Sequence, residues 1–340
     1  MCGIAGFVSN QSWQRDAHLL PLEQIAGDLA VAAGAETDWA LACDALDRLA
    51  DGFDALQSFG LFAEVVRSPD TAQRLRSVAE SLRVLSERAT RRTAEEGADA
   101  DLRALVEKLN DYVWQVQVEV LDFVGQVERV MPRPVSETGR PELFVAWSIA
   151  RVLSAVDRLE VRGRDSLGVS IVLRLQAPVS VPVPLREEFE RRCRADETVS
   201  GGMTVTDGDA VALRVVYKVA NLVGSLGENT ETIRSTLRDD VLLWRAAAEM
   251  QGLNIVAHTR WASNGIINES NCHPVDGTVE SARGSGTEGS DRVLFTLNGD
   301  VDNYADLVDS FVAARGKRIN PAVSTDAKIL PVLYSLGTER

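Results

Sequence analysis

A long block near the start of the chain has the composition and the spacing of packed helices. Residues 16–131 are rich in Ala, Leu, Arg, Asp and Glu and contain few Gly or Pro. Apolar residues recur there at intervals of three and four, which places them on one face of a helix. The two clearest runs are Leu75, Val78, Leu82 and Leu85, and Leu102, Leu105, Leu109, Val113, Val116, Val120, Val124 and Val127. We therefore expect residues 10–142 to be all-α, a helical hairpin or bundle whose second run is one long helix.

Both ends of this block carry boundary signals. Ser68-Pro69 has the form of an N-cap residue followed by a first-turn proline, so a helix should begin there. Pro132-Arg133-Pro134 ends the last helix, because proline cannot continue it, and turn-forming residues follow as far as Pro141. The remainder of the chain should therefore fold separately from the block.

Beyond this break the pattern alternates between helices and strands. An amphipathic helix is expected from residue 143 to about 162, followed by a half-buried strand whose apolar residues alternate over 169–175. The later elements that we expect are a strand over 211–219, a helix over 228–250, a strand over 253–257, a flexible loop over 281–290, a buried strand over 293–297, and helices over 303–314 and 327–336. This mixture predicts an α+β fold for residues 1–9 and 143–340.

The chain begins with Met1-Cys2-Gly3-Ile4-Ala5-Gly6-Phe7. Removal of the initiator methionine would leave Cys2 with a thiol and a free α-amine on one residue. A thiol of pKa about 8.5 and an amine of pKa about 8 form a matched nucleophile and base near neutral pH. No catalytic histidine is then needed. A start codon followed by small residues explains the same heptad, so the choice depends on the rest of the chain.

The composition of the chain disfavours several classes of binding partner and indicates where in the cell the protein is expected. The formal net charge of −14 disfavours nucleic acid and anionic membranes as partners. The cysteines at positions 2, 43, 193 and 272 are far apart and form no C-x-x-C pair, so we expect no zinc site, no other metal and no disulfide framework. Nothing in the sequence calls for a cofactor. Because there is neither a signal-peptide pattern nor an apolar run of about 18 residues, we expect a cytoplasmic protein.

Polar and aromatic residues gather at the ends of the expected strands in separated motifs. They are Cys2-Gly3-Ile4-Ala5-Gly6, Arg162-Gly163-x-Asp165-Ser166-x-Gly168, His258-Thr259-Arg260-Trp261-Ala262-x-x-Gly265, Asn271-x-His273-Pro274, Asn298-Gly299 and Ser324-Thr325-Asp326. In this order the motifs resemble those of the class II glutamine amidotransferases, N-terminal-cysteine enzymes that release ammonia from glutamine. The third and fourth motifs are most similar to the glutaminase domain of glucosamine-6-phosphate synthase (glutamine–fructose-6-phosphate aminotransferase). That branch belongs to amino sugar metabolism.

The resemblance implies a role for each residue of a catalytic site. Cys2 would attack the side-chain amide of glutamine and form a γ-glutamyl thioester, with its own α-amine as the base. The side-chain N–H of Asn298 and the backbone N–H of Gly299 would bind the developing oxyanion. Arg260 would hold the α-carboxylate of glutamine as a two-pronged donor. Asp326 would pair with the α-ammonium, although a helix N-cap explains an aspartate at this position as well.

Three further residues would complete the substrate pocket. Trp261 would shape the pocket or gate access to it, and a packed aromatic side chain is the alternative. Ser263 and Asn264 stand where the synthase branch usually has Thr and His. Both keep a hydrogen-bonding side chain, so glutamine binding is still expected in altered detail.

Three residues close to these motifs are interpreted as structural. His258 and His273 are candidate bases by type, but the N-terminal amine makes a histidine base unnecessary, and we interpret both as structural hydrogen-bonding residues. Cys272 lies beside His273 and suggests a Cys/His dyad. A small buried residue is the preferred interpretation of Cys272, because Cys2 already supplies the nucleophile.

The resemblance also implies a fold and partners. The fold would be an N-terminal-nucleophile αββα sandwich built from residues 1–9 and 143–340, with residues 10–142 as a helical insertion. The family domain continues beyond the Thr-Asp element, so the C-terminal part of the sandwich is expected to be missing. L-Glutamine would be the substrate. Ammonia would pass to an acceptor domain that binds a sugar phosphate, with fructose 6-phosphate as the expected acceptor. This domain would lie in the same longer chain or in a partner. A homo-oligomer is compatible with this arrangement.

Three alternatives stay open. The chain would be an amidotransferase of another branch with a different acceptor, or a non-catalytic regulatory protein on a degenerate amidotransferase fold, in which a retained Met1 blocks the amine. The third alternative is an amide hydrolase of the same superfold with another substrate. The pairing of Arg260 with Asp326 argues against this third alternative, because it suits a free amino acid.

Overall fold

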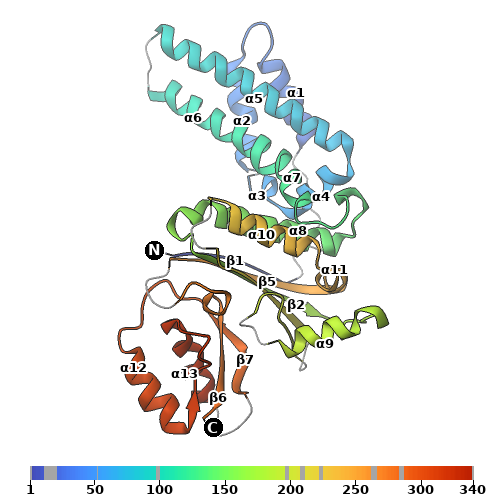
Figure 1. The fold of residues 1–340 in the computed structure, drawn as a ribbon. Helices are drawn as coiled ribbons and strands as arrows, with labels where there is room; N and C mark the ends of the chain where they lie inside the picture. Colours follow the sequence, from blue (N-terminus) through green and yellow to red (C-terminus); the bar gives the residue numbers. More distant parts are fainter. Residues whose placement is uncertain are drawn as a thin grey trace. The chain divides into compact units, whose positions relative to one another are not determined.

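A computed structural model describes most of the chain, and the helices and antiparallel strands within it form a mixed α+β protein (Figure 1). The described residues are 2–10, 21–51, 53–96, 100–195, 199–206, 211–221, 225–261, 266–282 and 287–338. The chain divides into two compact units. The mixed unit comprises Met1–Gln11, Val130–Pro132 and Val145–Arg340, and the helical unit comprises Ser12–Arg129 and Arg133–Phe144.

The described part of the helical unit is built mainly from helices. They are α1 (Leu22–Ala32), α2 (Trp39–Asp51), α3 (Phe53–Leu56), α4 (Phe59–Arg67), α5 (Pro69–Glu96), α6 (Ala100–Trp114) and α7 (Phe123–Glu128). Helix α5 begins as predicted, because the Ser68 hydroxyl accepts a hydrogen bond of 3.2 Å from the Thr71 amide. The predicted apolar run of α5 is fully buried and packs with buried residues of α1, α2 and α6.

The second predicted helix is not one regular helix. A π-helical stretch, Gln115–Leu121, separates α6 from α7. The Asp122 amide donates to the Gln117 carbonyl at 2.8 Å, and the Gln117 side chain donates to the Asp122 carboxylate at 2.8 Å. This side-chain bond closes the same five-residue turn and stabilises the wider helix. The apolar spacing alone could not indicate it, since Val116 and Val120 stay buried through the π turn.

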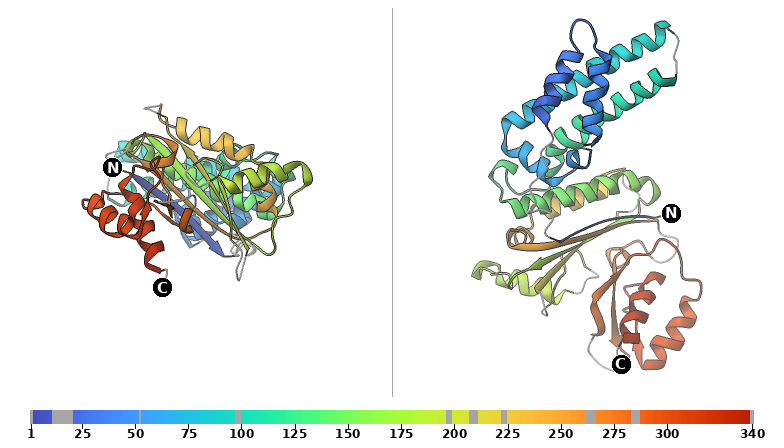
Figure 2. Two further views of the ribbon diagram at one scale, coloured as in Figure 1. Left: turned by 60° about the horizontal axis from the view of Figure 1, so that its bottom comes forward. Right: turned by 180° about the vertical axis from the view of Figure 1, so that it is seen from behind.

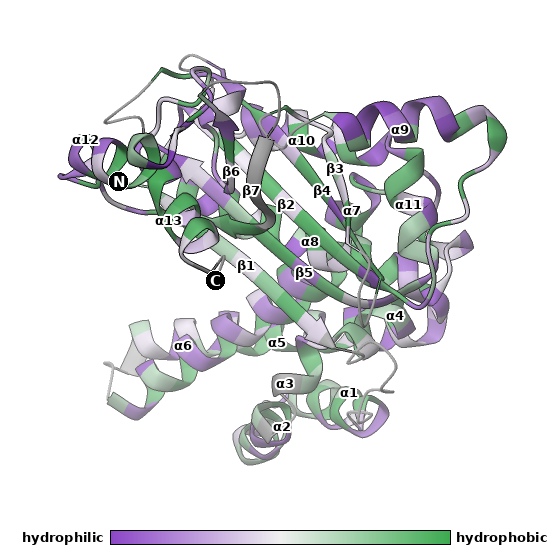
Figure 3. Ribbon diagram, turned by 90° about the horizontal axis from the view of Figure 1, so that it is seen from below, coloured by the Kyte–Doolittle hydropathy of each residue, from purple (hydrophilic) through white to green (hydrophobic). Residues whose placement is uncertain are grey.

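The mixed unit contains a large antiparallel sheet. Its strands are β1 (Gly3–Asn10), β2 (Ser166–Leu175), β3 (Met203–Thr206), β4 (Val211–Val219) and β5 (Met250–Arg260). They lie side by side in the order β1-β5-β2-β4-β3 (Figure 3). Strand β1 pairs with β5 so that Gly3 is opposite Thr259. This register brings the beginning of the chain to the end of β5, where the His-Thr-Arg-Trp motif lies.

Helices cover one face of the large sheet. They are the part of α8 (Arg140–Leu159) that belongs to this unit, α10 (Glu228–Arg238) and α11 (Val241–Ala248) (Figure 2). On this side, the rings of Phe7 on β1 and Trp147 on α8 meet edge to face, 6.0 Å apart.

The opposite face of the large sheet meets the segment around His273, and this corrects one expectation. Strand β2 was expected to be half-buried, yet its first six residues are all buried. A Cβ atom on Gly168 would lie 1.8 Å from the His273 carbonyl oxygen, so only glycine fits there. The strand is therefore covered on both faces, which alternation of apolar residues could not predict.

A second, smaller antiparallel sheet follows in the sequence. Its strands are β6 (Val275–Ser281), β7 (Thr287–Phe295) and β8 (Lys317–Arg318), in the order β7-β6-β8. Helix α13 (Ile329–Thr338) packs on β6 and β7 (Figure 2). The short helix α12 (Tyr304–Leu307) continues as a π stretch (Val308–Val312). A buried apolar cluster joins these parts through Val279, Val312, Ile329, Val332 and Leu336.

Two expectations about the region of β7 are wrong. Residues 281–290 were expected to be a loop, but β6 extends to Ser281 and β7 begins at Thr287, while residues 283–286 lie outside the described part of the chain. Residues 293–297 were expected to be a buried strand, but they are only partly buried and β7 ends at Phe295. The exposure follows from the position of β7 at the edge of its sheet.

The helix expected over 228–250 is two helices and the start of a strand. Asp240 separates α10 from α11, since its side chain caps α11 by accepting a 3.0 Å hydrogen bond from the Leu243 amide. Met250 is already the first residue of β5. No helix in the described ranges is both long and apolar enough to cross a membrane.

Candidate active site

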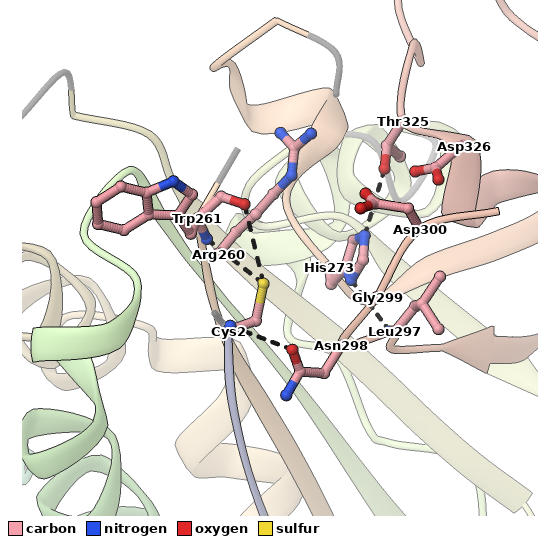
Figure 4. A pocket seen from close by; sticks show the side chains of 10 residues that line it. All are labelled: Cys2, Arg260, Trp261, His273, Leu297, Asn298, Gly299, Asp300, Thr325 and Asp326. Atoms are coloured by element: carbon pink, nitrogen blue, oxygen red, sulfur yellow. Dashed lines mark hydrogen bonds between the residues drawn. The ribbon is translucent and has the colours of Figure 1, made fainter. Parts of the chain in front are cut away.

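All the predicted site residues except Ser263 and Asn264 line one cavity of the mixed unit (Figure 4). Its volume is about 250 Å³, and its walls come from the start of β1, the end of β5, and the segments that follow β7 and precede α13. The lining residues are Cys2, Arg260, Trp261, His273, Leu297, Asn298, Gly299, Asp300, Thr325 and Asp326. The volume is below the roughly 300–1,000 Å³ of sites for drug-sized ligands, so it suits a ligand of amino-acid size.

The candidate nucleophile, Cys2, is positioned by main-chain contacts. The Gly3 amide donates to the Thr259 hydroxyl at 3.0 Å, which secures the beginning of β1 against β5. The Trp261 amide then donates to the Cys2 sulfur at 3.5 Å, and the thiol lies 3.9 Å from the Trp261 carbonyl oxygen. A Cβ atom on Gly3 would lie 2.6 Å from Leu159 Cβ, so glycine is required beside Cys2.

The candidate oxyanion residue, Asn298, contacts Cys2 directly. The main-chain nitrogen of Cys2 donates to the Asn298 side-chain oxygen at 3.2 Å (Figure 4). With Met1 removed, this nitrogen would be the α-amine, and Asn298 would orient it. The side-chain NH₂ of Asn298 then stays available as a donor, and Gly299 follows at the same wall of the cavity.

Arg260 lies at the end of β5 and is 5% exposed. Its Nη1 donates to the Ile266 carbonyl at 3.4 Å, and the Asp165 amide donates to the Arg260 carbonyl at 3.1 Å. A Cβ atom on Gly163 would lie 2.9 Å from the Arg260 carbonyl carbon. The Arg-Gly-x-Asp-Ser motif therefore serves to pack a backbone closely against the arginine.

Asp326 lines the cavity and also holds the turn that follows Gly299. One carboxylate oxygen accepts from the Val301 amide at 2.6 Å, and the other accepts from the Ala327 amide at 3.0 Å. The alternative of a helix N-cap is wrong, because Thr325 is the N-cap residue of the 3-10 helix Asp326–Lys328.

Asn271 organises the site, a role that the sequence motif did not indicate. Its side-chain oxygen accepts from the amides of Ser324, at 2.7 Å, and Thr325, at 2.9 Å. Its NH₂ group donates to the Ile266 carbonyl at 2.8 Å and to the Ser324 hydroxyl at 3.0 Å. Asn271 is fully buried, and both the oxygen and the nitrogen of its amide have two partners each. It thus ties the segment that contacts Arg260 to the segment that carries Asp326.

A buried ion pair supports the Asp326 segment from behind. Lys328, in the 3-10 helix, donates to Asp276 on β6, and both side chains are 3% exposed. Burial alone would raise the pKa of Asp276, but the Lys328 ammonium and the Thr278 hydrogen bonds hold it below its usual value. The two residues are 52 positions apart, so local spacing could not indicate that they form a pair.

The two histidines are neutral structural residues, as interpreted. His258 bonds the Leu297 carbonyl through Nε2 at 3.0 Å, and the Leu297 amide donates to His273 Nδ1 at 3.2 Å. Burial lowers the pKa of His258 to about 4 and lowers that of His273 well below its ordinary value. Cys272 is fully buried, and its thiol donates to the Val219 carbonyl at 3.4 Å. Burial raises the pKa of the Cys272 thiol, which does not suit a second nucleophile.

The three further residues predicted for the substrate pocket are Trp261, Ser263 and Asn264. Trp261 is 55% exposed, so it is not a packed aromatic and stays a candidate wall or gate of the cavity. Ser263 and Asn264 lie outside the described residues. Asp300 and Thr325 line the cavity without having been predicted to do so, although both adjoin predicted residues in the sequence.

Among the described residues, no group of three or more His, Cys, Asp or Glu side chains is placed to hold a metal ion. No protein-family model, curated protein or solved structure matches the chain.

Proposed function

We propose that the mixed unit is the glutaminase domain of a class II glutamine amidotransferase. The observation that carries this proposal is the convergence of Cys2, Arg260, Asn298 and Asp326 on one cavity of amino-acid size. Cys2 and Asn298 are 296 positions apart and yet share a hydrogen bond. A start codon followed by small residues gives no reason for this arrangement, whereas a nucleophile, an oxyanion donor and two charged substrate contacts require it.

The chemistry begins with the thiol and amine of Cys2 after removal of Met1. The amine takes the thiol proton, and the sulfur attacks the side-chain carbonyl carbon of glutamine. The oxyanion of the tetrahedral intermediate is bound by the Asn298 NH₂ and the Gly299 amide, donors that are each worth about 3 kcal/mol in such sites. The intermediate collapses with cleavage of the C–N bond, and ammonia leaves with the proton held by the amine.

Hydrolysis of the thioester completes the reaction. The amine accepts a proton from water, the resulting hydroxide attacks the thioester carbonyl carbon, and the C–S bond breaks to release glutamate. Arg260 holds the α-carboxylate throughout, and Asp326 is the nearby carboxylate for the α-ammonium. The base is the amine and not a histidine, because both histidines are buried and bonded to Leu297.

The fold of the mixed unit supports the same proposal at a coarser level. Helices cover the outer face of the large sheet, and α13 covers the small sheet. We infer that these layers are an N-terminal-nucleophile αββα sandwich. By resemblance, the ammonia passes to an acceptor domain that binds a sugar phosphate such as fructose 6-phosphate, and the protein works in the cytoplasm.

Substitution of the nucleophile tests the proposal. Cys2→Ala should abolish the release of glutamate from L-glutamine, because no other thiol lines the cavity in the described part of the chain. Cys193→Ala is the matched control, since Cys193 is exposed and lies on α9 (Arg186–Arg194), and it should keep full activity. The measurement is glutamate production by the purified chain, together with the mass of its N-terminus.

Two outcomes would contradict the proposal. Turnover that survives Cys2→Ala would show that Cys2 is not the nucleophile. A chain that keeps Met1 and releases no glutamate would favour the non-catalytic alternative, because an acylated nitrogen cannot act as the base.

A further inference from the structure

The peptide that precedes the oxyanion residues is held on both sides by histidine rings. Leu297 comes directly before Asn298 and Gly299. Its carbonyl oxygen lies 3.0 Å from His258 Nε2. Its amide donates to His273 Nδ1 at 3.2 Å (Figure 4). Both hydrogen-bonding groups of a single residue are therefore bound by side chains from other segments, β5 and the loop before β6.

The two rings, His258 and His273, form one unit that we call the histidine pair. Their centroids are 4.4 Å apart with an interplanar angle of 36°, and their residues are 0% and 4% exposed. This contact joins β5, the strand that pairs with β1 next to Cys2, to the segment before β6. The pair thus connects the parts of the mixed unit that carry Cys2 and Asn298.

The hydrogen bonds define the protonation of each ring. His273 accepts at Nδ1, so its proton is on Nε2, which faces the Thr325 hydroxyl at 3.5 Å. His258 donates from Nε2, so its Nδ1 is an acceptor, and this atom is buried without a hydrogen-bond partner among the described residues. A second proton on His273 would place an N–H against the Leu297 N–H. The pair therefore works only as two neutral rings of these tautomers.

We propose that the histidine pair positions the oxyanion donors by setting the plane of the Leu297 peptide groups. The carbonyl bound by His258 belongs to the peptide bond between Leu297 and Asn298. Its direction decides where the Asn298 side chain and the Gly299 amide lie. Donors to an oxyanion act only within about 2.7–3.1 Å of the oxygen, so a small rotation of this peptide would remove them from the reaction. This inference rests on the proposed function, because it assigns the pair a role in that reaction.

A general-base role suits the pair less well. Among the described residues, the hydrogen bonds of the Cys2 thiol are with the main chain of Trp261 and not with a ring nitrogen. The ring nitrogens nearest the oxyanion segment are already bonded to Leu297. A role in packing alone is also insufficient, since apolar side chains of similar size would leave the partly buried amide and carbonyl of Leu297 without these hydrogen-bond partners.

Isosteric variants separate positioning from packing. In His258→Gln, the side-chain NH₂ can occupy the place of Nε2, and in His273→Asn the side-chain oxygen can occupy the place of Nδ1. The mismatched variants His258→Asn and His273→Gln carry the same amide group, but the length of the side chain places that group away from the position of the ring nitrogen. We expect the mismatched variants to lose about 100-fold in kcat for glutamine, the effect of a misplaced catalytic group, with little change in KM. The matched variants should regain most of this loss.

A measurement without substrate accompanies the kinetics. Hydrogen exchange at the Leu297 amide should be slow in the wild type and in His273→Asn, and faster in His273→Gln. Thermal unfolding checks that each variant is folded, so that a kinetic loss is not a loss of structure.

The outcomes separate the two proposals. If the wild type releases no glutamate, the proposed function fails, and the positioning role fails with it whatever the exchange result. If the wild type is active, equal kcat in matched and mismatched variants overturns the positioning role alone. A rise in KM at constant kcat also overturns it, because the pair would then act in substrate binding.

Discussion

At the scale of single residues, the side chains that shape the cavity work mainly by bonding the main chain. Asn271 binds the amides of Ser324 and Thr325, and Asp326 binds those of Val301 and Ala327. These contacts hold irregular segments in place where no strand or helix would do so. The geometry of the site therefore depends on Asn271, which does not line the cavity, as well as on Asp326, which does.

Asn271→Leu should separate this organising role from catalysis. Leucine has a similar shape but removes the acceptor of the Ser324 and Thr325 amides and one of the two donors to the Ile266 carbonyl. We expect a loss of about 3 kcal/mol in the free energy of unfolding, because buried polar groups lose their hydrogen bonds. Urea denaturation measures this loss, and the KM for glutamine should rise because Arg260 and Asp326 lose their common support.

Asn303→Ala is the control for this substitution. Asn303 is an exposed N-cap residue of α12 whose side chain makes no capping hydrogen bond, so its loss should change stability little. Equal stability of the two variants would contradict the role of Asn271.

The residue types of the candidate site could be predicted from the sequence, but their supports could not. Cys2 was identified because a thiol and an amine on one residue are chemically distinctive, and Arg260 and Asp326 were identified by their motifs. The four partners of Asn271 and the pairing of Asp276 with Lys328 depend on distances between remote segments. Local spacing carries no information about such distances.

At the scale of elements, periodicity predicted the type of most helices and strands but not where they break or what covers them. The apolar run of α5 is buried as predicted, because apolar residues that recur every three or four positions form one stripe of a helix, and that stripe packs against the core. The break between α10 and α11 was missed, because it depends on a buried network around Asp240. Arg192 on α9 donates twice to Asp240, at 2.9 and 2.6 Å, and the Tyr217 hydroxyl donates to it at 2.5 Å.

Asp240→Ala should destabilise the mixed unit strongly. The substitution removes the cap of α11 and leaves Arg192, which is 8% exposed, as a buried charge without its partner. Loss of one member of a buried ion pair typically costs about 3–5 kcal/mol, and we expect a fall of this size in the free energy of unfolding, measured by urea denaturation. Asp239→Ala changes the adjacent residue, whose side chain is 78% exposed, and should have almost no effect. A small effect of Asp240→Ala would show that the network is not needed to end α10.

At the scale of the whole molecule, the mixed α+β class followed from the sequence, whereas the pairing of the strands did not. The sequence predicted strands over 169–175, 211–219, 253–257 and 293–297, yet nothing local indicated that β1 pairs with β5 or that β7 forms a sheet edge. The pairing of strands in a sheet is decided by contacts between segments that are far apart in the sequence. His258 and His273, the two histidines among the described residues, both lie in the mixed unit.

The stability of the whole chain should fall in mild acid. The pKa of His258 is lowered by burial from 6.5 to about 4, so the folded state resists protonation and the unfolded state does not. The stabilisation is fully present above pH 6.5 and is lost as the pH falls toward 4. At about 1.4 kcal/mol per pH unit, His258 alone should remove about 2 kcal/mol by pH 5. The lowered pKa of His273 acts in the same direction.

Thermal unfolding between pH 8 and pH 5 measures this dependence, and His258→Gln is the comparison. The variant cannot take up the proton, so its unfolding temperature should change less with pH. A wild-type profile as flat as that of the variant would show that His258 does not resist protonation.

The pairing of β1 with β5 has a consequence for the timing of synthesis. Thr259, the partner of Gly3 in the register, is synthesised 256 residues after it. At roughly 5–20 residues per second, the first strand waits about 10–50 s for its neighbour, while the helical unit between them can already form. During this interval the N-terminus is not yet enclosed by β5. The order of synthesis thus provides a period in which methionine can be removed from Cys2 before the strand is fixed in its sheet.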